Sequence, residues 1–71
     1  MKRALLDALQ AKYEAEIAEA DAVVNIYLEK SVGIGEHPQF IEEIDKQVLR
    51  IADAQEKIEV LKSFESEKQA L

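Results

Sequence analysis

The sequence has no cysteine and only one histidine, His37. A chain without cysteine forms neither disulfides nor thiolate metal sites, and one histidine is too few for the usual histidine-based zinc sites. We therefore expect no cofactor. The stability of a 71-residue chain must instead come from helix packing and from association with a partner chain, because a core of this size rarely suffices.

Basic residues are also scarce. Nine lysines and arginines stand against fifteen acidic residues, which gives a net charge of −6, and the basic residues form no cluster. A protein that binds nucleic acid needs a basic face to neutralise phosphates. We therefore expect no nucleic-acid partner.

Long apolar runs are missing too. Uninterrupted apolar stretches span only a few residues, whereas a helix that crosses a bilayer needs ~20. The residues after Met1 are interrupted by Asp7 and Gln10 and lack the apolar core of a signal peptide. These absences predict no membrane segment and a cytoplasmic location.

Glycine and proline occur only between Gly33 and Pro38. Gly33 is suited to end a helix in the left-handed conformation, and Pro38 is suited to the first turn of the next helix. A turn this short makes the two helices antiparallel neighbours. We therefore predict a single domain over residues 1–71, with a helix at about 3–31, a turn at 32–37 and a second helix at about 38–69.

Apolar residues on both sides of this turn recur at steps of three and four, the spacing of one face of an α-helix. Several of them are seven residues apart, as in a coiled coil. The sequence thus predicts an all-α fold, an antiparallel two-helix hairpin with coiled-coil-like packing. The residues expected in the hairpin or dimer seam are Leu6, Leu9, Tyr13, Ile17, Val24, Ile44, Val48, Ile51, Ile58 and Leu61.

The apolar stripe is wider than one seam requires, because Leu5, Val23, Leu49 and Val60 extend it. A wide stripe is typical of a helix that contacts more than one neighbour. The simplest additional neighbour is a second copy, so we expect a homodimer that forms a four-helix bundle. The alternative is a monomer that docks on a different protein.

Two features suggest chemistry but have simpler explanations. The carboxylates between Glu14 and Asp21 lack the Glu-x-x-His partners of a di-iron bundle, which favours a solvated face. Within this run, Glu16 shares a heptad position with Leu9 and is predicted to set the register at the edge of the seam. The Gly33-Ile34-Gly35 segment has neither the preceding strand nor the further glycines of a phosphate-binding loop. We therefore expect no enzymatic activity.

Five residues near the turn are candidates for contact with a partner. Aromatic side chains are frequent anchors of interfaces, although packing within the hairpin explains them equally simply. The apolar residues of the turn either contact a partner or pack across the end of the hairpin, and the histidine either contacts a partner or caps a helix. The candidates are Val32, Ile34, His37, Phe40 and Tyr27.

The turn Val32-Gly33-Ile34-Gly35-Glu36-His37-Pro38, with the helical segments that flank it, resembles small helical-hairpin proteins encoded by marine tailed phages, especially cyanophages. The likeness covers the central half to two-thirds of the chain. It implies a phage origin, with the host cytoplasm or the virion as the place of action. It supplies no catalytic residue.

From these observations we expect a non-catalytic interaction or structural module, a self-associating hairpin with a role as a phage accessory or assembly protein. The principal partner would be a second copy, together with a protein whose identity the sequence does not reveal. The alternative is a small acidic inhibitor that binds one host or phage enzyme.

Overall fold

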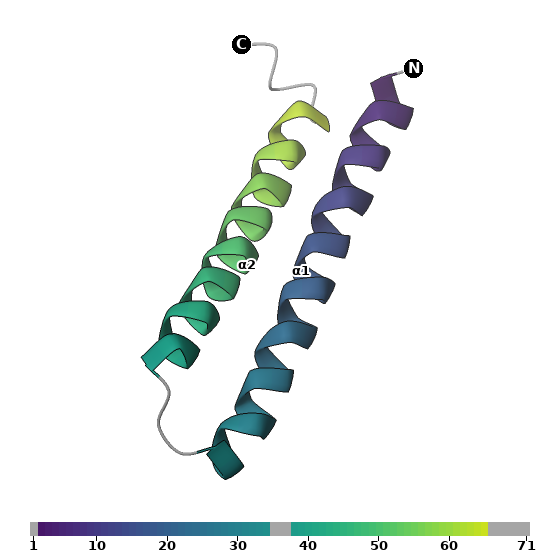
Figure 1. Ribbon diagram of the computed structural model, residues 1–71. Coiled ribbons are helices and arrows are strands. Elements are labelled where there is room, and N and C mark those ends of the chain that lie inside the picture. The colour runs from purple at the N-terminus through teal and green to yellow at the C-terminus, as the bar shows by residue number, and fades with distance from the viewer. Residues whose placement is uncertain (1, 35–37, 66–71) are drawn as a thin grey trace.

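The computed structural model describes residues 2–34 and 38–65. It consists of two helices, α1 (Lys2–Ile34) and α2 (Pro38–Glu65). The helices run antiparallel and side by side, so that the start of α1 and the end of α2 lie at the same end of the molecule (Figure 1). We call this the open end, and the opposite end the turn end. The predicted all-α hairpin is confirmed.

The boundaries of the helices differ from the predicted ones. α1 continues to Ile34, three residues beyond the expected end, so Gly33 belongs to its last turn rather than to the connection. One glycine in a helix costs only about 1 kcal/mol relative to alanine, which a helix of 33 residues tolerates. α2 begins at Pro38, as expected for a proline in a first turn, and is described as far as Glu65. The predicted continuation to about residue 69 lies outside the described residues.

Alanine accounts for the length of α1. Its side chain has the highest helix propensity, and six alanines line the outward side of this helix, where all are exposed. They are Ala4, Ala8, Ala11, Ala15, Ala18 and Ala22. On this side of α1, the helix is therefore favoured by the intrinsic helix propensity of alanine and not by packing against a neighbour.

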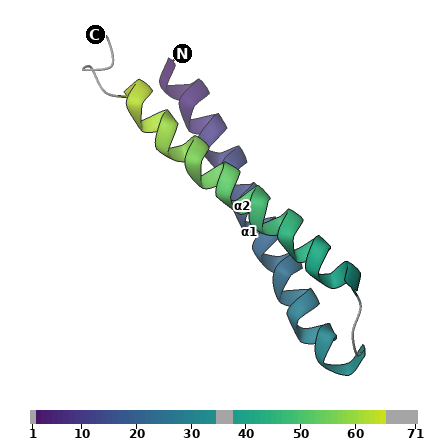
Figure 2. The same cartoon turned by 90° about the vertical axis from the view of Figure 1, so that its left-hand side faces the viewer.

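The contact between the helices follows one line of residues in each. The line in α1 consists of Leu6, Tyr13, Ala20 and Tyr27, and the line in α2 of Phe40, Gln47, Ala54 and Leu61. Among the described residues the buried apolar side chains are Ala20, Ala54 and Leu61, at 0%, 3% and 6% exposure. Figure 2 shows that the helices stay close along their length and cross at a shallow angle.

An aromatic contact joins the helices at the turn end. The ring centroids of Tyr27 and Phe40 are 5.4 Å apart and their planes make an angle of 64°. This edge-to-face arrangement is favourable because the positive edge of one ring meets the negative face of the other. Both candidate contact residues are therefore half-buried in the hairpin itself. Within residues 2–34 and 38–65, neither helix combines the length and the apolar character needed to span a membrane.

Candidate protein-binding surface

The hairpin has two different sides, which the register of the helices defines. In an α-helix, residues three positions after the contact line lie on one flank of that line, and residues four positions after it lie on the other flank. Glu16 follows Tyr13 by three and Arg50 follows Gln47 by three, and these two side chains are bonded across the seam. The two +3 flanks therefore meet on one side, and the two +4 flanks meet on the other.

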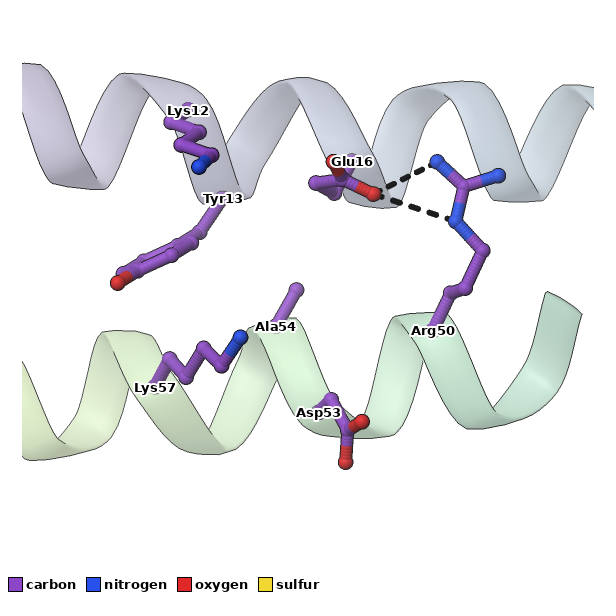
Figure 3. A pocket seen from close by; sticks show the side chains of 7 residues that line it. All are labelled: Lys12, Tyr13, Glu16, Arg50, Asp53, Ala54 and Lys57. Atoms are coloured by element: carbon purple, nitrogen blue, oxygen red, sulfur yellow. Dashed lines mark hydrogen bonds and ion pairs between the residues drawn. The ribbon is translucent and has the colours of Figure 1, made fainter.

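The first side is built around Arg50. Its Nε and Nη2 atoms donate to Oε1 of Glu16 at 3.2 Å and 2.6 Å. Nη2 also donates to Oε1 of Glu19 at 2.5 Å, and Nη1 donates to Oε1 of Gln47 at 2.9 Å. Figure 3 shows the guanidinium reaching from α2 to the Glu16 carboxylate on α1. We call Arg50, Glu16 and Glu19 the arginine clamp.

The clamp agrees with the register role predicted for Glu16. One guanidinium binds two carboxylates that lie three residues apart on the other helix, which is possible only when the helices hold one axial level relative to each other. The charge-assisted bonds are short and directional. A shift of one helix turn, about 5.4 Å, would break them, so the clamp selects this alignment.

The clamp also changes the acidity of its members. The hydrogen bond from Arg50, followed by its positive charge, lowers the pKa of Glu16 below the ordinary 4.5, against a smaller opposing effect of burial. The bonds to Glu16 and Glu19 raise the pKa of Arg50 further above its ordinary value. Because Glu16 is held ionised near neutral pH, it is a poor general acid.

A shallow hollow of about 270 Å³ lies beside the clamp, between the helices. Side chains of both signs line it together with Tyr13 and Ala54, as Figure 3 shows. The ammonium of Lys57 lies 5.4 Å from the centre of the Tyr13 ring, a cation–π contact. Within residues 2–34 and 38–65, no group of three or more His, Asp or Glu side chains is arranged to hold a metal ion.

The opposite side of the hairpin is apolar. Its orientation is confirmed at the open end, where Arg3 and Glu65, both on +4 flanks, form an ion pair at 3.5 Å. Further along, the same flanks carry branched aliphatic residues, and two more follow on the outer edge of α2. We call this set the isoleucine face: Ile17, Val24, Ile41, Ile44, Val48, Ile51 and Ile58.

The isoleucine face is only partly covered by the hairpin. Ile41 and Val48 are 75% and 50% exposed, and the remaining five side chains are half-buried. The seven residues contribute no charge and no side-chain hydrogen-bonding group. They form a band along most of α2, with Ile17 and Val24 of α1 beside it.

The predicted seam residues differ in how far the hairpin buries them. Leu61 is buried, whereas Leu6, Tyr13, Ile17, Val24, Ile44, Ile51 and Ile58 are half-buried. Leu9 and Val48 are exposed within the hairpin, at 38% and 50%. The centre of the seam in α2 is the line of Gln47 and Ala54. Val48, which the sequence analysis included among the seam residues, lies one position away from this line.

The five candidate partner contacts near the turn are described only in part by the structure. Of the five candidate contacts, Tyr27 and Phe40 contact each other, His37 lies outside the described residues, and so do the side chains of Val32 and Ile34. The periodicity of apolar residues did not predict the contact made by Arg50. A signal for it exists, because Arg50 and Glu16 are charged residues of opposite sign on the seam flanks of the two predicted helices.

Comparisons of this chain with protein-family models, with curated proteins and with solved structures find no match. The resemblance to phage hairpin proteins therefore stays a prediction. The assignment of function rests on the two sides of the hairpin described above.

Proposed function

We propose that this chain is a non-catalytic protein-binding module that associates with a second copy of itself through the isoleucine face. The carrying observation is the exposure of Ile41 and Val48 within a continuous apolar band. Branched aliphatic side chains gain about 25 cal/mol for each Å² removed from water. A band of this kind is typical of an interface.

The small core of the hairpin supports this proposal. Among the described residues the buried apolar side chains are Ala20, Ala54 and Leu61, so the hairpin covers few of its apolar residues by itself. A chain of this size usually needs a further source of stability, such as a partner chain. A second copy seated on the isoleucine face would cover Ile41 and Val48.

Other functions make different demands on the surface. An acidic inhibitor would act through its carboxylates and would leave the isoleucine face exposed in the free protein, so it would remain a monomer. A catalytic role would depend on side chains able to exchange protons or to attack a substrate, and the isoleucine face contains none. Self-association accounts for the apolar band, and the other two functions do not.

Sedimentation analysis with two neighbouring variants tests the proposal. Val48 lies on the isoleucine face and is 50% exposed, whereas Leu49 is 60% exposed on the outward side of α2. We expect the wild type and Leu49→Glu to sediment as dimers. Val48→Glu should sediment as a monomer or lose helicity in circular dichroism, because a charge on the face opposes burial.

Two results would overturn the proposal. The first is a wild type that remains monomeric up to high micromolar concentration. The second is a Val48→Glu variant that associates as strongly as Leu49→Glu. A further variant, Ile41→Lys, gives an independent reading, because Ile41 is 75% exposed and its replacement leaves the packing within the hairpin unchanged.

A further inference from the structure

Two hairpins can bring their isoleucine faces together about a two-fold axis in two ways. If the axis runs along the helices, the turn ends lie together and α1 of each copy is beside α2 of the other. If the axis runs across the helices, the turn ends lie apart and α1 is beside α1. These arrangements bring different edges of the face into contact, so the charges on those edges discriminate between them.

The edge of the face on α1 is acidic. Three acidic residues lie on the +4 side of α1, each one position after a residue of the contact line. They are Asp7, Glu14 and Asp21, and all three are exposed. The side chain of Asp7 is 61% exposed even though its carboxylate pairs with Arg3 at 3.4 Å. With α1 beside α1, two such acidic edges would face each other, and like charges placed together oppose association.

The corresponding edge on α2 has no acidic residue. It consists of Ile41, Val48, Gln55 and Lys62. In the arrangement with α1 of one copy beside α2 of the other, the acidic edge of α1 therefore faces apolar side chains, one neutral polar side chain and one lysine. Lys62 forms an exposed pair with Glu59 of its own helix at 3.1 Å, and its side chain is 66% exposed.

The axial levels agree with this pairing. Three contacts fix which residues of α1 and α2 lie at the same height: Arg3 with Glu65, Glu16 with Arg50, and Tyr27 with Phe40. With the turn ends together, α2 of the second copy has the same levels. Asp7 then lies level with Lys62 of the second copy, and Glu14 lies level with Gln55.

We infer that two copies of this chain pack face to face with their turn ends together, so that α1 of each lies antiparallel beside α2 of the other. The inference rests on the proposed self-association and adds the orientation of the partner. Each helix then has two antiparallel neighbours, one from its own chain and one from the second copy, which is the geometry of an up-and-down four-helix bundle. The arginine clamp lies on the outer side, away from the second copy.

Spin-label distances measure the orientation directly, and labelling is specific because the chain has no cysteine. Gln39 is exposed near the turn end, and Ala52 is exposed near the middle of α2. In Gln39→Cys, we expect a distance below about 30 Å between the labels of the two copies, since neighbouring helix axes are 8–10 Å apart. With the turn ends apart, the distance would exceed about 40 Å, the length of a 28-residue helix.

Ala52→Cys is the matched control, because a central label gives a short distance in both arrangements. A short distance for Ala52→Cys with a long one for Gln39→Cys overturns the inferred orientation and leaves self-association standing. If neither variant shows a distance between copies, self-association itself fails and the orientation fails with it. Short distances in both variants support the inference.

A charge exchange tests the contact between edges. Lys62→Glu should weaken dimerisation by about tenfold in Kd, since a close like-charge pair replaces an attractive one. Adding Asp7→Lys should restore most of the affinity. If the double variant is no tighter than Lys62→Glu alone, the pairing of Asp7 with Lys62 of the second copy is wrong.

Discussion

The burial of Leu61 makes a quantitative prediction about the stability of the hairpin. This side chain is 6% exposed, whereas Leu49, on the outward side of the same helix, is 60% exposed. Burying a leucine completely is worth about 1.5–3 kcal/mol, and a cavity left by its removal adds to the loss. We therefore expect Leu61→Ala to lower the free energy of unfolding by about 2–3 kcal/mol.

The same replacement at the exposed position is the control. Leu49→Ala should lower the free energy of unfolding by about 0.5 kcal/mol or less, since most of the side chain is in water and alanine favours helix slightly more than leucine. In a chain of this size, 2–3 kcal/mol corresponds to a fall in Tm of about 10–20 °C.

Urea unfolding followed by circular dichroism measures both variants at one protein concentration, because association with a second copy makes stability depend on concentration. Equal losses in the two variants would refute the assignment of Leu61 to the seam between α1 and α2. A loss confined to Leu49→Ala would show that the outward side of α2 is covered in solution, which contradicts the interface proposed here.

Three further predictions concern the polar and aromatic contacts. Because Arg50 lowers the pKa of Glu16 in the folded state, the protein takes up a proton when it unfolds in acid. The urea midpoint should therefore fall as the pH drops below about 4.5. The fall should be less steep in Glu16→Gln, which lacks this carboxylate. Arg50→Met retains an apolar stem but removes the clamp, so it should lower the urea midpoint more than Lys46→Met does. Lys46→Met removes one exposed pair with a neighbouring glutamate and should change the free energy of unfolding by less than about 0.5 kcal/mol. A double-mutant cycle of Tyr27→Leu and Phe40→Leu should give a coupling of about 0.5–1.5 kcal/mol, and a coupling near zero would show that the rings do not interact.

The helical hairpin could be predicted from the sequence because local signals agree. Apolar residues at steps of three and four identify two helices, and Gly33, Gly35 and Pro38 lie together between them. The sequence does not determine the end of α1, because a glycine near the end of a helix is compatible both with the helix ending and with its continuing. The cost of about 1 kcal/mol is small relative to the hydrogen bonds of a long helix, and α1 continues to Ile34.

The division of the apolar stripe could not be predicted. A single stripe is visible on α2, centred on Ile44, Val48 and Ile51, but the contact with α1 is centred on Gln47 and Ala54. The periodicity shows which residues avoid water, and it does not show which neighbour covers them. Side-chain size and polar bonding decide the rotation, since alanine permits close approach and Arg50 reaches Glu16 from only one flank.

The length of chain between two contacting residues also affects which end of the hairpin opens first. Tyr27 and Phe40 are joined by a short segment, whereas Arg3 and Glu65 are separated by nearly the whole chain. Contacts close in sequence form at a smaller entropic cost and faster than distant ones. We therefore expect the contacts between α1 and α2 to form first at the turn end and last at the open end. The bond between Glu16 and Arg50, near the middle, then fixes the alignment of the two helices. Amide hydrogens at the open end should exchange first, through local fraying that leaves the rest of the helix pair intact.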